Sequence, residues 1–192
     1  LGLSSQVEEL SQKNIQSLIN LYNQGDYDRA LLEIDRLVDI YPDAVILHNI
    51  AGASQAALRQ YEAAIETYKK ALELQPDNAE VHNNMGNAFK SEGNFKAAIK
   101  SYKQALRINP NYETAHNNMG NALSDKGDVE AAIESYKKAI KLKPDYADAH
   151  NNLGVILQEL GRFEDAEASY LKAIALKPDF SDTIRNIQSQ NQ

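Results

Sequence analysis

The sequence predicts an all-α repeat protein of the solenoid type. All five prolines of the 192-residue chain follow one another at a constant spacing of 34 residues, at Pro42, Pro76, Pro110, Pro144 and Pro178. A fixed period of this size is typical of stacked structural repeats. Within each period, apolar residues recur at intervals of three and four, which is the signature of an amphipathic helix. A glycine near the middle of most periods divides them, so each period is expected to hold two helices joined by a turn.

The composition excludes several classes of protein and partner. Lys and Arg number 20 against 27 Asp and Glu, a formal net charge of −7, so neither nucleic acid nor an anionic membrane is expected as a partner. The absence of cysteine excludes disulfides, zinc ribbons and thiol catalysis. The sequence contains no long apolar run and no signal peptide, which makes the cytoplasm the default location. Because residue 1 is Leu, we expect a processed chain or a piece of a longer one.

The period divides the chain into five units, with an N-terminal extension at 1–10 and a predicted capping helix at 181–192. The units are 11–44, 45–78, 79–112, 113–146 and 147–180. The third and fourth units share 17 of 34 residues. Counting within a unit, position 20 is always Ala, while positions 8, 24 and 27 are Gly, Tyr and Ala in four of the five units. The first unit departs from the pattern at those three positions, as terminal repeats often do.

This pattern resembles the tetratricopeptide repeat (TPR) family over residues 11–180. The resemblance is to near-consensus bacterial TPR domains and to the TPR arm of O-GlcNAc transferase. It implies a right-handed superhelical solenoid of five TPR helix-turn-helix units plus a C-terminal capping helix, forming a single domain over 1–192. The small residues at positions 8, 20 and 27 are then expected where the second helix of a unit crosses the first.

Local signals predict where the helices begin and end. Ser5 and Glu8 fit a capping box, so the first helix is expected from about Gln6 to Asn23. The Asp or Asn that follows each proline is a candidate cap for the next helix. Mid-unit glycines suit a left-handed helix end, and Arg59 at the same place in the second unit predicts a slightly strained or differently shaped turn. The mid-unit glycines are Gly25, Gly93, Gly127 and Gly161.

The sequence offers no catalytic or metal-binding constellation. One histidine recurs at position 4 of four units, at His48, His82, His116 and His150. Equivalent residues of stacked helices lie about 8–10 Å apart, whereas zinc needs nitrogen ligands within about 2.1 Å of one point. We therefore expect the histidines to pack under a neighbouring helix with one ring nitrogen bonded. With no phosphate loop and no H-E-x-x-H motif, the chain is predicted to be no enzyme and to bind no cofactor or metal.

The TPR resemblance implies that the first helix of each unit lines a concave groove, and asparagines concentrate at its positions 5, 6 and 9. They are Asn49, Asn83, Asn117 and Asn151 at position 5; Asn84, Asn118, Asn152 and Asn186 at position 6; and Asn87 and Asn121 at position 9. A carboxamide both donates and accepts, so a row of them can bind the backbone of an extended peptide. The row is similar to the asparagine ladder of O-GlcNAc transferase. The alternative is that these amides bond to neighbouring backbone and only support the scaffold.

The expected groove is graded in polarity. Its N-terminal end is apolar, with Ile15, Ile19, Tyr22, Ile46 and Ala53. Its C-terminal half is acidic, with Glu80, Asp125, Asp148 and Glu159. We therefore expect a protein or peptide partner with an apolar anchor and basic residues. Alternatively, the apolar end packs against residues 1–10 or against a second copy of the chain.

Three functions follow as hypotheses. The first is a protein-protein interaction module that binds a peptide or helical segment of a partner in the Asn-lined groove. The second is a substrate-recruiting arm of a larger enzyme of the glycosyltransferase or sulfotransferase type, and the third is a self-assembling scaffold. The lysine pairs at 69–70 and 137–138 are balanced by nearby acids such as Glu66 and Glu134, which indicates a solvated helix face.

Overall fold

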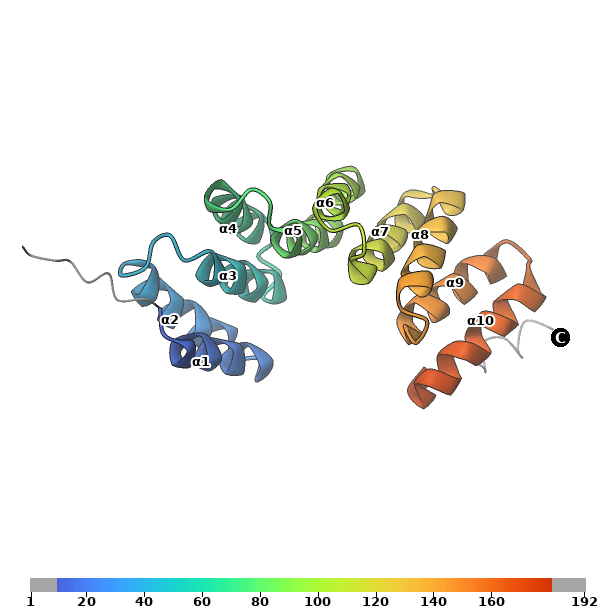
Figure 1. Ribbon diagram of the computed structural model, residues 1–192, viewed down its shortest axis with the longest axis horizontal. Helices are drawn as coiled ribbons and strands as arrows, with labels where there is room; N and C mark the ends of the chain where they lie inside the picture. The colour runs from blue at the N-terminus through green and yellow to red at the C-terminus, as the bar shows by residue number, and fades with distance from the viewer. Residues whose placement is uncertain (1–9, 181–192) are drawn as a thin grey trace, which may run out of the picture. The chain divides into compact units, whose positions relative to one another are not determined.

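A computed structural model describes residues 10–180, and within that range the chain forms ten α-helices and no strand (Figure 1). The helices are α1 (Gln12–Asn23), α2 (Tyr27–Val38), α3 (Val45–Ala57), α4 (Tyr61–Leu74), α5 (Ala79–Ser91), α6 (Phe95–Ile108), α7 (Glu113–Lys126), α8 (Val129–Leu142), α9 (Ala147–Glu159) and α10 (Phe163–Leu176). A short 3₁₀ turn, η1 (Pro178–Phe180), follows. The predicted all-α fold, with two helices in each 34-residue period, is confirmed.

The chain divides into two compact units, with the boundary between Glu92 and Gly93. Unit 1 contains α1 to α5 and unit 2 contains α6 to α10. In both, each even-numbered helix packs against the odd-numbered helices on either side of it in the same unit. Odd-numbered helices also touch one another, α1 with α3, α3 with α5, and α7 with α9. The organisation of 1–192 as a single solenoid domain stays a prediction.

The core of each unit consists of small and aromatic residues at the periodic positions. In unit 1, Leu18, Ile34 and Leu47 are buried around α1 to α3, and Ala64 and Tyr68 are buried against α5. In unit 2 the corresponding core residues are Tyr102, Ala132, Tyr136, Ala139 and Tyr170. The position-24 tyrosines are therefore core residues, and the rings of Tyr68, Tyr136 and Tyr170 fill the space between the two helices of their repeats.

The glycines at position 8 make room for those tyrosines. A Cβ placed on Gly52 would lie 2.6 Å from Tyr68 Cε1, and one on Gly120 would lie 2.5 Å from Tyr136 Cε1. Gly154 would contact the Tyr170 ring at 2.6 Å. These separations are far shorter than the 3.5–4.0 Å at which carbon atoms attract one another. The predicted close approach of the second helix is confirmed, and its partner is the aromatic ring of the same repeat.

The turn within each repeat is left-handed whichever residue occupies it. The four mid-unit glycines have φ between 72° and 87°, and Arg59 has φ 61°. A non-glycine residue in this region is disfavoured because its Cβ approaches the following carbonyl oxygen. The prediction of strain at Arg59 is confirmed, while the turn keeps the shape of the others.

Five helix starts differ from the sequence prediction. The first helix begins at Gln12 and not near Gln6, because Ser11 is extended and its side chain accepts a bond from the Asn14 amide at 3.2 Å. The residue after each of the first four prolines is also not the N-cap. The N-caps of α3, α5, α7 and α9 lie one residue later, at Ala44, Asn78, Tyr112 and Tyr146. The predicted capping box at Ser5 and Glu8 and the capping helix at 181–192 lie outside the described residues.

Candidate functional site

The asparagines at position 5 are buried in three repeats. Asn49, Asn83 and Asn117 have exposed fractions of 7%, 3% and 4%. A buried carboxamide is costly unless it is hydrogen-bonded. Asn49 and Asn117 accept hydrogen bonds from the following repeat and so connect repeats, whereas contact of the three amides with a partner stays a prediction.

In unit 1 the amides form a chain of side-chain hydrogen bonds. Asn84 Nδ2 on α5 donates to Asn49 Oδ1 on α3 at 3.1 Å, and Asn49 Nδ2 donates to Glu80 Oε1 at 2.8 Å. Asn83 Nδ2 donates to Asn84 Oδ1 at 3.3 Å. The bond to the carboxylate is charge-assisted and is the strongest kind in this set. These hydrogen bonds hold α3 against α5 and fix the direction in which the Asn84 amide points.

Unit 2 repeats the same connection between α7 and α9. Asn152 Nδ2 donates to Asn117 Oδ1 at 3.1 Å and to Asn121 Oδ1 at 3.0 Å. Asn121 Oδ1 also accepts from the Tyr136 hydroxyl at 2.8 Å. Position 6 of one repeat thus donates to position 5 of the repeat before it, in unit 1 and in unit 2 alike. The alternative given in the sequence analysis was that these amides form hydrogen bonds to neighbouring backbone. Their partners are instead side chains of the adjacent repeat.

The apolar residues predicted for the N-terminal end of the groove come together in unit 1. A hollow of about 280 Å³ lies over α1, α3 and α5. Its lining is Ile19, Tyr22, Ile46, Asn49, Ile50, Ala53, Glu80 and Asn84. A second hollow of about 170 Å³ shares Tyr22, Ala53 and Asn84 with the first and adds Asn87. The two hollows form a furrow, which we call the unit 1 furrow, with apolar walls and an amide rim.

The sequence did not predict how two residues of this furrow, Ile50 and Glu80, contribute to it. Ile50 was not expected to contribute, although it occupies position 6, beside the groove positions, where the other units carry polar residues. Glu80 was assigned to the acidic half, but its bond to Asn49 holds it at the apolar furrow. Ile15, which was expected at the apolar end, is half-buried and does not line the furrow.

The predicted acidic residues of unit 2 are exposed and gather around tyrosine hydroxyls. Burial raises the pKa of Tyr136, and the carboxylates of Asp125 and Glu159 raise it further. Burial also raises the pKa of Tyr146, with Asp148 contributing in the same direction. These carboxylates therefore lie close enough to the two phenols to act on them, and they give α7 and α9 an acidic surface. Asn118 and Asn151 are half-buried on the same helices, and Asn186 lies outside the described residues.

The histidines serve the scaffold. In each of the four repeats the His Nε2–H donates to the carbonyl of the proline six residues earlier, at 2.9–3.2 Å. The expectation of one bonded ring nitrogen is confirmed. The part of the chain that the structure describes holds no group of three or more His, Cys, Asp or Glu residues that could bind a metal ion.

Comparison with known proteins agrees with the repeat architecture. A family model described as TPR repeat matches residues 56–91, 86–127 and 120–161, and a tetratricopeptide repeat model matches 147–180. No curated protein matches the chain in a sequence search. Among residues 10–180, no helix is long and apolar enough to cross a membrane.

Solved structures share the fold at low sequence identity. A thermophilic TPR protein of Thermus thermophilus aligns with a TM-score of 0.76 and 24% identity, covering 93% of this chain and 97% of its own. YrrB, described as a TPR protein with an unusual peptide-binding site, gives 0.67 and 23%, covering 93% of each chain. MamA from Desulfovibrio magneticus gives 0.73 and 19%, covering 86% and 96%. From the matched repeats and the helix pairs that they form, the chain belongs to the tetratricopeptide repeat family.

Proposed function

We propose that the protein is an interaction module that binds a peptide segment of a protein partner in the unit 1 furrow. The observation that carries this proposal is the furrow itself, in which apolar side chains of α1 and α3 surround an open space next to hydrogen-bonded polar groups of α3 and α5. Recognition sites of this kind combine apolar walls for affinity with a few oriented polar groups for specificity. The TPR neighbour described as having a peptide-binding site supports the same class of ligand.

The partner segment places an apolar side chain against Ile19, Ile46 and Ala53. Burying one such side chain is worth about 1.5–3 kcal/mol. Asn84 uses one N–H on Asn49 and accepts from Asn83, so its second N–H remains to donate to a peptide carbonyl. Asn87 also lines the furrow.

The same segment carries basic residues. Glu80 lies in the furrow and accepts the Asn49 N–H with one oxygen, so its carboxylate retains acceptor sites for a Lys or Arg. In unit 2, exposed Asp125, Asp148 and Glu159 form an acidic surface that attracts further basic residues of the partner. Such charges act mainly on the association rate and on specificity.

The test begins with selection of displayed random peptides on the immobilised chain, followed by calorimetric titration of the enriched sequences. Enriched peptides should pair an apolar residue with Lys or Arg. Ala53→Phe fills the furrow and should weaken binding at least roughly tenfold, the loss of about 1.4 kcal/mol. Ala63→Phe, on the exposed face of α4, makes the same chemical change away from the furrow and should bind like wild type. Equal binding by the two variants would contradict the proposal.

Buried asparagines are unsuitable for this test. Substituting Asn49, Asn83 or Asn117 removes a bond within the scaffold, so a loss of binding would report the fold as much as the contact. The proposed module performs no chemistry of its own. The recruiting-arm and self-assembly hypotheses stay predictions, and the mass of the chain in solution at several concentrations tests the second of them.

A further inference from the structure

The third repeat differs from its neighbours in the charge of its second helix. Helix α6 carries Lys96, Lys100, Lys103 and Arg107 and contains no Asp or Glu. The four equivalent helices, α2, α4, α8 and α10, each contain at least two acidic residues. A strongly basic helix is unexpected in a chain with a net charge of −7.

Two of these lysines stand where the neighbouring second and fourth repeats carry glutamate. Position 18 is Asp28, Glu62, Glu130 or Glu164 elsewhere and Lys96 here. An acid in the first turn of a helix is favoured by the helix dipole and a lysine is disfavoured, each by about 0.3–1 kcal/mol. Helix stability therefore does not account for Lys96. The structural role of the position is the same in all repeats, which leaves an interaction outside the helix as the reason for the change.

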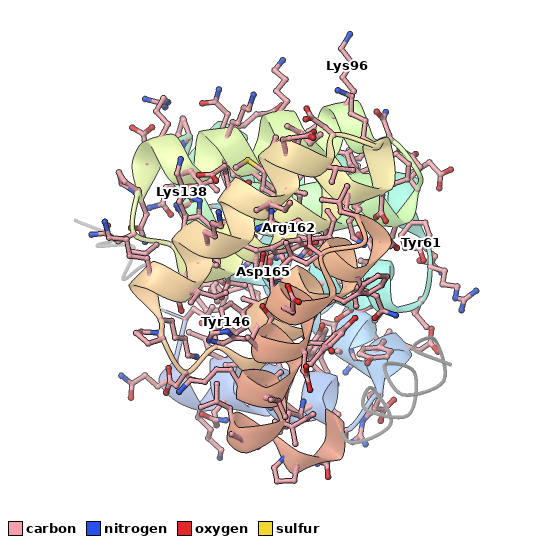
Figure 2. The ribbon with its side chains drawn as sticks, turned by 90° about the vertical axis from the view of Figure 1, so that its right-hand side faces the viewer. Tyr61, Lys96, Lys138, Tyr146, Arg162 and Asp165 are labelled. Carbon is pink, nitrogen blue, oxygen red and sulfur yellow. The ribbon has the colours of Figure 1, made fainter. Side chains whose placement is uncertain are left out.

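The second reversal removes an ion pair. In α4, Lys69 pairs with Glu66 at 2.5 Å, and in α8, Lys137 pairs with Glu134 at 3.5 Å. At the same two positions α6 has Lys103 and Lys100, so two like charges replace an ion pair. Figure 2 shows the contrasting arrangement at the start of α10, where Arg162 and Asp165 face each other in an ion pair of 2.6 Å.

The lysines of α6 border a concave surface. A hollow of about 620 Å³ is lined by Asn94, Lys96, Ala97, Ile99, Lys100, Lys103, Gln104 and, from the end of α7, Lys126. Lys96, Lys100 and Lys103 follow one another at intervals of four and three residues, so they share one face of the helix. Lys96 projects away from the ribbon (Figure 2). Within residues 10–180 none of the four lysines makes a hydrogen bond or an ion pair.

We propose that this surface, which we call the α6 lysine surface, binds an acidic peptide segment of a protein partner. Four ammonium groups without carboxylate partners supply the charge, and Ala97, Ile99 and the lysine stems supply apolar contact around them. The three lysines of α6 span about 10 Å at 1.5 Å per residue. That length matches acidic side chains one to two turns apart on a helix, or a few residues apart on a strand. A long nucleic acid would meet the chain's negative charge beyond this surface, whereas a short acidic segment would not.

The site is independent of the unit 1 furrow and selects the opposite charge. The probe for it is a fluorescein-labelled peptide with glutamates at three- and four-residue intervals, followed by anisotropy. Its glutamine counterpart and a single-stranded DNA of similar length are the comparison ligands. Wild type should bind the glutamate peptide at least roughly tenfold more tightly than the glutamine peptide, and added salt should weaken that binding because it screens the charges.

The decisive variant is the double substitution Lys96→Glu and Lys100→Glu, which restores the charges of the neighbouring repeats. It should melt at or above the temperature of wild type and lose at least roughly tenfold in affinity for the glutamate peptide. The matched control, Lys69→Glu with Lys70→Glu on α4, changes the net charge by the same amount and should bind within about twofold of wild type. Equal losses in the two double variants, or tighter binding of DNA than of the peptide, would overturn the proposal.

Discussion

Single atoms decide how closely the two helices of a repeat approach. At Gly120 the absent Cβ leaves the space that the Tyr136 ring occupies, since that Cβ would lie 2.5 Å from the ring. Tyr136 is buried and its hydroxyl donates to Asn121, so the ring is held at both ends and has no free direction in which to move. The same glycine and tyrosine pairing occurs at Gly52 and Gly154.

We predict that Gly120→Leu lowers the free energy of unfolding by about 3 kcal/mol or more, because overpacking of a rigid core typically costs 1–3 kcal/mol or above. Tyr136→Ala alone should cost about 3–5 kcal/mol through the cavity that it leaves. The double variant should cost less than the sum of the two, since the leucine then fills the cavity. Urea denaturation of the four proteins measures the coupling, and strictly additive costs would show that the two residues do not meet.

The contribution of His116 to stability depends on pH. Burial lowers the pKa of this imidazole below its usual value, and nearby Lys138 acts in the same direction, while the bond to the Pro110 carbonyl opposes them. The unfolded chain takes up this proton near pH 6.5 and the folded chain only at lower pH. Between the two pKa values the unfolded state binds more protons than the folded state. The contribution of His116 to the free energy of unfolding is therefore fully present above about pH 6.5 and is lost as the pH falls.

We therefore predict that the melting temperature of wild type falls between pH 7.5 and pH 5 by more than that of His116→Gln. His150→Gln removes the same kind of bond to a proline carbonyl and controls for it. Thermal melts followed by circular dichroism at several pH values measure the difference. The predicted role of His116 is wrong if wild type and His116→Gln lose the same amount over this range.

At the scale of an element, the end of α3 carries the one strained turn among the described repeats. Arg59 adopts φ 61°, where the other four repeats have glycine. The strain of a non-glycine residue in this conformation is about 1–2 kcal/mol. Glycine would remove this strain, but it would also lower the free energy of unfolding by about 0.5–1 kcal/mol because the unfolded chain gains conformational freedom.

Arg59→Gly is accordingly predicted to stabilise the protein by about 0.5–1 kcal/mol, the difference between relieved strain and lost chain entropy. The Arg59 side chain is exposed, so its removal carries little cost of its own. Arg59→Ala keeps the strained backbone and should show no comparable gain. Chemical denaturation compares the three proteins, and a Gly variant no more stable than the Ala variant would contradict this account.

For the molecule as a whole, the sequence predicted the parts that depend on the repeat and missed those that depend on side-chain geometry. The 34-residue period, the position-8 glycines and the histidines were sufficient to predict the helix pairs and their contacts. The direction of the amides was not predictable, because positions 5 and 6 are both Asn in the third to fifth repeats and only the packing of the helices decides which amide is buried. The α6 lysine surface could be recognised in the sequence because the segment that forms α6 contains no Asp or Glu. The net charge of the whole chain does not reveal this local difference.

The repeats of the chain follow one another without interruption. The 34-residue period continues without a linker across the boundary between Glu92 and Gly93. We propose that residues 11–180 form one array in which neighbouring repeats stabilise each other, as in other repeat proteins. Tyr136→Ala should then reduce hydrogen-exchange protection in α3, α4 and α5 as well as in unit 2, by less with increasing distance in sequence. If protection in unit 1 stays at the wild-type level, the two units are separate domains, and each surface proposed above belongs to an independently folding half.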